Sequence, residues 1–239
     1  MGRIFEKRKN RMFARWDSMS RAFTKIGKEI AIAVKLAGPD PDSNPRLRMA
    51  MQTARTHNMP KDRVENAIKK ASSKDESGLE EITYEAYAPH GVALFVETAT
   101  NNPTRTVANV RNYITKHGGS MATEGALGFL FERQGVFQIV KVESDLDELE
   151  LELIDHGLIE MFEGEEGDLL VHVQFQHFGE AQKFLEEKKI EVKSAGLQRL
   201  PLSTVEVTAE HTVTVQKIID LLEEDEDVQH VYHNMKTAE

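Results

Sequence analysis

Apolar residues recur at helical spacing along the N-terminal part of the chain. They fall at the following positions: Phe5, Met12, Trp16, Met19, Phe23, Ile26, Ile30 and Ala33. Steps of three, four and seven residues are typical of one face of an α-helix, so we expect a long helix that ends near Gly38. Asn44 and Pro45 have the pattern of an N-cap followed by proline in the first turn, and Pro60 starts a third helical segment. The pattern predicts three helices packed as a small bundle, followed by a polar linker at 72–78.

Beyond this linker the apolar spacing changes from about 3.6 to 2, which indicates strands. Residues 134–201 contain a complete β-α-β-β-α-β order, the ferredoxin-like plan. One more helix and one more strand follow Pro201. Between the linker and residue 134 we expect two strands, a helix and a further strand in these ranges: 81–88, 91–99, 100–119 and 126–132.

The order of these elements predicts an α+β protein with an insertion. Residues 79–133 hold strands and one helix but lack a second helix to cover their sheet. Three domains strictly in series would leave the C-terminal helix and strand too small to bury a core. We therefore expect a basic helical domain at 1–78, followed by two ferredoxin-like α/β domains. One is discontinuous, 79–133 plus 202–239, and the other, 134–201, is inserted in it.

Charge is divided unevenly between the two ends of the chain. Residues 1–78 hold 18 Lys and Arg against 9 Asp and Glu, a net charge of +9. The other 161 residues hold 12 against 31, a net charge of −19. Lys and Arg neutralise phosphates and release counterions, so the basic end can meet nucleic acid while the acidic remainder is turned away. The alternative is an ordinary solvated surface whose opposite charges are segregated by chance.

The candidate binding residues are cations of the helical part and of the helix start at 103. Residues 1–35 hold ten Lys and Arg against three Asp and Glu. We expect these side chains to contact nucleic acid: Lys7, Arg8, Lys9, Arg11, Arg15, Arg21, Lys25, Lys28, Arg46, Arg48, Arg55 and Arg105. Arg105 stands between Thr104 and Thr106 at a helix N-terminus, a ready phosphate site, although capping explains the threonines equally well. The interleaved Phe5, Phe13 and Trp16 either stack on bases or pack the bundle.

The sequence offers no pattern typical of an enzyme. Cysteine is absent, which excludes disulfides, thiolate metal sites and a cysteine nucleophile, and fits a reducing compartment. The histidines lack HExxH spacing, and His230 and His233 are interpreted as surface residues. The acidic run 223–227 is interpreted as a solvated turn, and no carboxylate is paired with a nucleophile in a catalytic pattern. We expect no catalytic residue, no cofactor and no metal.

No apolar stretch approaches the length of about 18–20 residues that spans a bilayer, and the first residues lack the apolar run of a signal peptide. We therefore expect a soluble, cytoplasmic protein with no membrane partner. The sequence leaves the oligomeric state open, with a monomer favoured.

Five segments carry a resemblance that covers nearly the whole chain in order. They are FTKIGKEIAIAVKLAGPDPDSNPRLRMAM at 23–51, NMPKDRVENAIKKA at 58–71, YEAYAPHGVALFVE at 84–97, NNPTRTVANVRNYITKHGGSMATEGALGFLF at 101–131 and DVQHVYHN at 227–234. These segments resemble the YebC family of bacterial proteins, whose mitochondrial relative is a translational activator of cytochrome oxidase. The resemblance implies a three-domain fold and a non-enzymatic role in gene expression. Family members are described as DNA-binding transcriptional regulators, while others look like ribosome-associated factors that help translation through proline-rich stretches.

The chain departs from the family pattern in two places. The family commonly opens with GHSKW and a basic run; here Phe5 stands at the tryptophan, with Lys9 and Arg11 near the basic run. The family's glycine-rich turn YEGYGPGG is YEAYAPHG in this chain, with alanines and a histidine in place of three glycines. If those glycines permit close approach to a partner, this member belongs to a divergent branch with a different target.

We therefore predict a nucleic-acid-binding regulator of gene expression that is not an enzyme. Its partner is duplex DNA in a transcriptional role, or ribosomal RNA and the ribosome in a translational role. Asn, Gln and Arg are not concentrated on one exposed helical stretch, which slightly favours RNA. The alternative is a protein-interaction scaffold that offers sheet edges to partners and has no direct contact with nucleic acid; an enzyme comes third.

Overall fold

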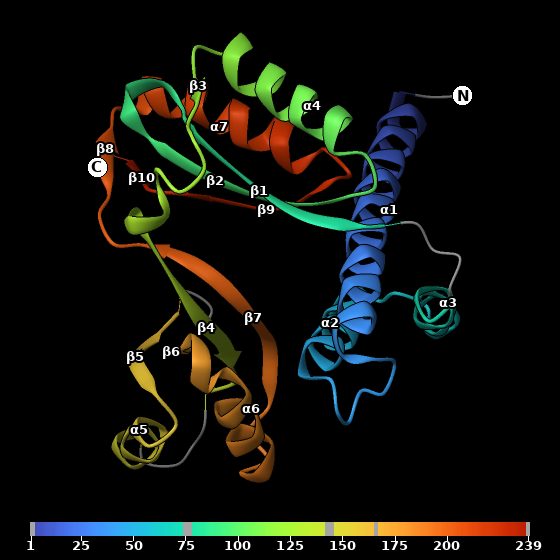
Figure 1. The fold of residues 1–239 in the computed structure, drawn as a ribbon, viewed down its shortest axis with the longest axis vertical. Helices are drawn as coiled ribbons and strands as arrows, with labels where there is room; N and C mark the ends of the chain where they lie inside the picture. Colours follow the sequence, from blue (N-terminus) through green and yellow to red (C-terminus); the bar gives the residue numbers. More distant parts are fainter. Residues whose placement is uncertain (1–2, 74–77, 142–145, 165–166, 238–239) are drawn as a thin grey trace. The chain divides into compact units, whose positions relative to one another are not determined.

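The computed structural model describes residues 3–73, 78–141, 146–164 and 167–237, with side chains from Ser18 onward. The chain divides into two compact units (Figure 1). Unit 1 comprises Met1–Ala126 and Val205–Glu239, and unit 2 comprises Leu127–Thr204. Unit 1 contains a helical part and an α/β part, whose expected separation into two domains stays a prediction.

Three helices form the helical part of unit 1: α1 (Arg3–Ala37), α2 (Pro45–Thr56) and α3 (Lys61–Ala71). As predicted, Asn44 caps α2, because its side-chain oxygen accepts a hydrogen bond from the Leu47 N–H at 3.0 Å. The Asn44 amide also donates to the carbonyls of Ala33 and Gly38, both at 2.8 Å, and so ties the end of α1 to the start of α2. The core of the helical part joins the second half of α1 to α2 and α3: Ile26, Ile30, Ala33, Val34, Leu47, Ala50, Ala54, Val64 and Ala71.

The α/β part of unit 1 is an antiparallel sheet with two helices on one face (Figure 1). Its elements are β1 (Glu80–Tyr87), β2 (Ala93–Thr100), α4 (Pro103–Lys116), β3 (Ser120–Met121), α7 (Ala209–Glu223) and β9 (Val228–His233). The core includes Val110 and Ile114 of α4, and Ile218 and Leu222 of α7. Asn102 caps α4 as predicted, by accepting a hydrogen bond from the Arg105 N–H. Two short strands not expected from the pattern form a separate parallel pair: β8 (Val205–Val207) and β10 (Met235–Thr237).

The strand order of this sheet is β3-β1-β2-β9. Its two central strands are the β1–β2 hairpin, through which the chain enters the sheet. In a ferredoxin-like sheet the central strands instead belong to two different β-α-β units. The sheet therefore has antiparallel strands and two covering helices, as the α+β class requires, but its strand order differs from the ferredoxin-like order.

Unit 2 has the ferredoxin-like topology. Its elements are β4 (Phe131–Ile139), α5 (Leu146–Ile154), β5 (Leu158–Glu163), β6 (Leu169–Gln174), α6 (Phe178–Glu187) and β7 (Val192–Pro201). The order β5-β6-β4-β7 places the first and third strands of the β-α-β-β-α-β series in the centre. The rings of Phe137 on β4 and Phe178 on α6 stack with their centroids 4.7 Å apart, which joins the helix layer to the sheet.

The prediction of a strand at 126–132 is wrong. The 3₁₀ turn η2 (Gly128–Leu130) occupies this stretch instead. Two other short 3₁₀ turns occur in the chain, η1 (Pro89–Gly91) and η3 (Phe175–His177). Gly125 has a left-handed φ of 81°, and strand pairing begins only at Phe131, in the sheet of unit 2. A short apolar run next to glycines carries no period that separates a strand from a turn.

The structure confirms the predicted α+β class, with N-terminal helices followed by antiparallel sheets. Along the described part of the chain, no helix combines the length and the apolarity needed to cross a bilayer.

Candidate nucleic-acid interface

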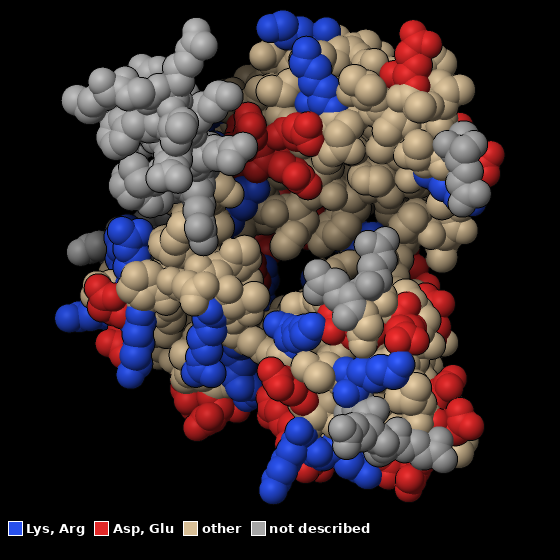
Figure 2. Space-filling model, turned by 180° about the vertical axis from the view of Figure 1, so that it is seen from behind, with Lys and Arg blue, Asp and Glu red and all other residues tan. Residues whose placement is uncertain are grey.

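Lys and Arg side chains stand out over the helical part of unit 1, at the lower left of the face drawn in Figure 2. The exposed cations of α3 were not assigned a role from the sequence; they include Lys61, Arg63 and Lys69. They lie away from the buried Val64 and Ala71 on the same helix. Helical periodicity was the signal that could have identified them.

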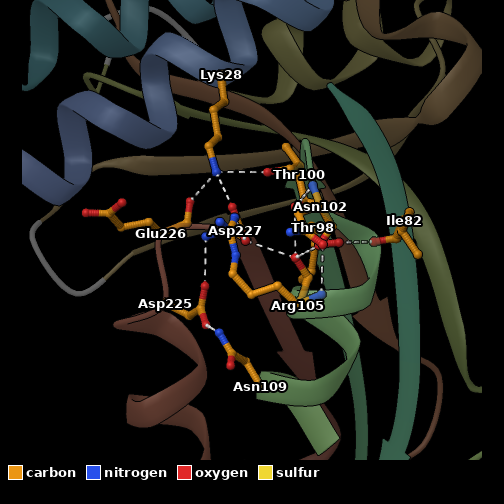
Figure 3. Close-up of polar contacts among 12 residues, drawn as sticks. Lys28, Ile82, Thr98, Thr100, Asn102, Arg105, Asn109, Asp225, Glu226 and Asp227 are labelled. Atoms are coloured by element: carbon orange, nitrogen blue, oxygen red, sulfur yellow. Dashed lines mark hydrogen bonds and ion pairs between the residues drawn. The ribbon is translucent and has the colours of Figure 1, made fainter. Parts of the chain in front are cut away.

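Other candidate cations point inward, and two of them meet at Asp227 (Figure 3). The Asp227 side chain is only 6% exposed. Its carboxylate accepts hydrogen bonds from Lys28 Nζ at 2.6 Å, Arg105 Nη2 at 2.6 Å and Thr106 Oγ1 at 2.9 Å. Lys28 belongs to α1, whereas Arg105 and Thr106 belong to the first turn of α4. The carboxylate therefore fixes α1 against the α/β part of unit 1.

Lys28 has no donor left for a phosphate. An ammonium group has three N–H donors. In addition to Asp227, Lys28 Nζ donates to the carbonyl oxygens of Ala99 at 2.9 Å and Glu226 at 2.8 Å. Contact with nucleic acid would require Lys28 to break one of these bonds.

The N-terminus of α4, offered by the sequence as a phosphate site, is occupied by the Asp227 carboxylate. The helix dipole and the Thr106 hydroxyl stabilise this carboxylate in the way they would stabilise a phosphate. The Arg105 side chain stays 51% exposed while its guanidinium is bonded to Asp227.

The interpretation of residues 223–227 as a solvated turn is wrong for two of its carboxylates. Asp227 is buried, and Asp225 accepts hydrogen bonds from Asn109 Nδ2 at 3.1 Å and Tyr113 Oη at 3.2 Å. The donors come from α4, more than a hundred residues earlier in the chain. A local run of acidic residues carries no information about partners so distant in sequence.

The environment of Asp227 gives unit 1 a specific pH dependence. Burial acts to raise the pKa of Asp227, but hydrogen bonds from Lys28, Arg105 and Thr106 outweigh it and hold this pKa below the ordinary 3.8. Because the folded pKa lies below the unfolded pKa, the ionised carboxylate stabilises the fold above about pH 4, and this stabilisation is lost as pH falls through the folded pKa.

We expect the difference in free energy of unfolding between the native protein and Asp227→Asn to be constant from about pH 7 to pH 5 and to shrink below about pH 4. Urea unfolding at each pH measures this difference. A difference that stays the same down to acid unfolding would show that the Asp227 charge contributes nothing.

Arg46 is also held within the protein. Its guanidinium donates to Glu29 on α1, with Nε at 2.7 Å from Oε1, and to Glu81 on β1, with Nη2 at 2.6 Å from Oε1. Burial acts to lower the pKa of Arg46, but hydrogen bonds to Glu81 and Glu29 raise it above its ordinary value. Planar pairing with two carboxylates is the geometry that a guanidinium would otherwise offer to a phosphate.

Two further candidates donate to carbonyl oxygens of the protein. Lys25 Nζ lies 2.7 Å from the Glu223 carbonyl oxygen at the end of α7, and burial lowers the pKa of Lys25. Arg48 Nη1 donates to the carbonyls of Pro41 and Asp42, both at 2.9 Å, and braces the loop between α1 and α2.

The twelve candidates thus fall into three groups. Five are engaged inside the protein: Lys25, Lys28, Arg46, Arg48 and Arg105. Arg21 and the exposed Arg55 make no hydrogen bond or ion pair with another side chain that the structure describes. The side chains of the remaining five lie outside the described residues: Lys7, Arg8, Lys9, Arg11 and Arg15. Their backbone belongs to α1, and their binding role stays a prediction.

No group of three or more His, Asp or Glu within the described ranges could hold a metal ion. The His90 and His211 rings stack with centroids 3.5 Å apart, but they are a pair without a third ligand.

Comparison with known proteins gives a consistent assignment. Residues 3–74 match the family model described as the TACO1/YebC protein N-terminal domain, and residues 79–235 match that of the TACO1/YebC second and third domain. A protein of Porphyromonas gingivalis is 54% identical over 240 residues, covering 100% of this chain and 99% of the relative. A protein of Parabacteroides distasonis is 54% identical over 237 residues, covering 99% and 97%.

Both relatives carry the name probable transcriptional regulatory protein, the name of a regulator and not of an enzyme. The crystal structure of a conserved hypothetical protein from Aquifex aeolicus superposes with a TM-score of 0.81 at 36% identity, covering 92% of this chain and 91% of that one. Family models over most of the chain, close relatives along its length and a shared fold lead to one conclusion: this chain belongs to the TACO1/YebC family.

Proposed function

We propose that this regulator acts by binding nucleic acid through the first half of α1. The observation that carries the proposal is the charge of residues 3–17, which hold six Lys and Arg against two Asp and Glu. This stretch belongs to a continuous helix, and a cationic helix can follow a phosphate backbone and release its counterions.

The internal ion pairs of unit 1 support a division of α1 into two halves. In the second half, Lys25 and Lys28 are bonded to oxygens of the α/β part. Apolar residues from Ile26 onward pack against α2 and α3. The second half therefore anchors the helix, and the proposal assigns phosphate contact to the first half.

The acidic remainder of the chain complements this arrangement. A net charge of −19 on residues 79–239 repels phosphates, so an encounter with a polyanion is oriented toward the basic end. The names of the relatives support a role in regulation. Contacts with phosphates position a protein but carry no sequence information, so the proposal is for sequence-blind affinity. RNA is favoured over duplex DNA because Asn, Gln and Arg are not concentrated on one exposed helical stretch.

Cosedimentation of the native protein with ribosomes, set beside duplex binding at about 0.15 M salt, tests this proposal. We expect the protein to pellet with ribosomes and to bind duplexes weakly, with the same affinity for unrelated sequences. Tight duplex binding at one sequence that survives added salt would make DNA the target. Failure to bind ribosomes, and duplexes even at low salt, would overturn the proposal and leave a protein-interaction scaffold.

A further inference from the structure

Four of the exposed cations of α2 and α3 are here called the α2–α3 surface: Arg55 in the last turn of α2, and Lys61, Arg63 and Lys69 on α3. We infer that the α2–α3 surface is a second phosphate-contacting surface, which extends the contact made by the first half of α1. The inference rests on the proposed function and adds three residues to which the sequence pattern gave no role: Lys61, Arg63 and Lys69.

The backbone that carries these cations is held by hydrogen bonds. Asn58 has a left-handed φ of 54° and closes the turn. The Asn58 N–H donates to the Arg55 carbonyl at 2.9 Å, and the Met59 N–H donates to the Ala54 carbonyl at 2.8 Å. The Arg63 N–H bonds back to the Pro60 carbonyl at 3.0 Å, which starts α3. The cations are therefore presented from two helices joined by a fixed turn, so docking a phosphate orders side chains and not the main chain.

The cations of the α2–α3 surface make weaker contacts within the protein than the paired cations of unit 1 do. Arg55 and Lys69 form no ion pair with another described side chain. Lys61 is 91% exposed, and its contact with Glu65, at 3.5 Å, joins two exposed groups. Exposed pairs of this kind contribute little to stability. A phosphate can replace such contacts at small cost, whereas it would have to break the buried network around Lys28.

The charge of this segment is locally unbalanced. Residues 55–71 hold five Lys and Arg against two Asp and Glu. A solvated helix face in an acidic protein does not require such an excess. Figure 2 shows the cations of the helical part standing clear of the surface, where a long polyanion can reach several of them together.

Arg63 connects the α2–α3 surface to α1. Its guanidinium carbon lies 5.6 Å from the centroid of the Phe23 ring, which belongs to α1. Phe23 is eight residues after Arg15, a helical rise of about 12 Å. The α2–α3 surface therefore begins about two helical turns from the end of the basic stretch 3–17, which puts both within the reach of one nucleic-acid segment.

The test neutralises three of the cations together: Arg55→Gln, Arg63→Gln and Lys69→Gln. Neutralising three phosphate contacts should lower the slope of log Kd against log salt by about 2.7 on duplex DNA, and by about 2.1 on a single-stranded RNA. Kd at about 0.1 M salt should rise roughly ten- to a hundredfold. The factor should be the same for unrelated sequences, because phosphates are common to all. Fluorescence anisotropy over a salt series measures each quantity.

A second triple variant controls for net charge. Lys116→Gln, Lys183→Gln and Lys217→Gln remove three exposed cations from other helices. This control should keep the native slope. Thermal unfolding of both variants checks that the changes leave the fold intact.

The outcomes separate this inference from the proposed function. If the native protein binds and the α2–α3 variant keeps its slope and Kd, the α2–α3 surface makes no contact while the proposed function stands. Equal losses in the variant and its control also overturn the inference, because net charge alone would explain them. If the native protein binds neither nucleic acid, the proposed function itself fails.

Discussion

Replacing Asp227 with alanine should lower the free energy of unfolding by about 3 kcal/mol, a magnitude typical of breaking a buried, hydrogen-bonded ion pair. The change removes the shared acceptor of Lys28, Arg105 and Thr106. The Lys28 side chain is 18% exposed, so its charge would stay largely out of water without the partner that compensates for burial. Urea unfolding followed by circular dichroism measures the loss.

Glu226→Ala is the matched control for this variant. Glu226 is the neighbouring residue and also a carboxylate, but its side chain is exposed. Only its backbone carbonyl accepts from Lys28, and alanine keeps that carbonyl. We expect a change within about 0.5 kcal/mol. Equal losses in the two variants would show that Asp227 has no special role in attaching α1.

Neutralising Lys7, Arg8, Lys9 and Arg11 with glutamine should raise Kd for nucleic acid at least about a hundredfold near 0.1 M salt, and should lower the duplex salt slope by about 3.6. These residues supply four of the six cations of the basic stretch 3–17. Glutamine has nearly the helix propensity of lysine and arginine, so the helix itself should persist. A salt series by fluorescence anisotropy gives both quantities.

The control for this variant removes the same charge from elsewhere: Lys116→Gln, Lys183→Gln, Lys217→Gln and Lys236→Gln. All four lysines are exposed, so their loss should leave the slope near the native value. If the variant in α1 binds as the native protein does, the first half of α1 is not the binding element. A scaffold would in addition keep its protein partners after this change.

Local chemistry made much of the fold predictable. The N-caps at Asn44 and Asn102 depend on residues within three positions of the cap, and the apolar spacing of α1 is regular over many turns. The short strands β8 and β10 depend instead on pairing between Val205–Val207 and Met235–Thr237, far apart in the chain. A sequence window of a few residues carries no signal of such long-range pairing.

The site was predictable only in part, because sequence gives the position of a charge and not its partner. Lys28 and Asp227 are separated by 199 positions, and nothing near either residue indicates that they meet. Arg46 likewise pairs with Glu81 on a strand 35 positions away. The exposed cations of α3 were different, since the helical period around Val64 already sets them on the solvent side.

The departures from the family's glycine-rich turn have separate physical consequences. Ala86 and Ala88 are buried in the core of the α/β part of unit 1, so their methyl groups pack inside and do not alter the surface. His90 is exposed, with a left-handed φ of 67° that a non-glycine residue rarely adopts. Its ring stacks on His211. Any change in target recognition at this turn should come from His90.

Photo-crosslinking of the native protein to bound RNA, followed by mass spectrometry of the crosslinked peptides, would identify directly the segment that contacts nucleic acid. We expect crosslinks in residues 3–17, which include Phe5, Phe13 and Trp16, and none in the acidic unit 2, Leu127–Thr204. Crosslinks confined to unit 2, with the basic stretch of α1 unmodified, would show that the first half of α1 is not the binding element.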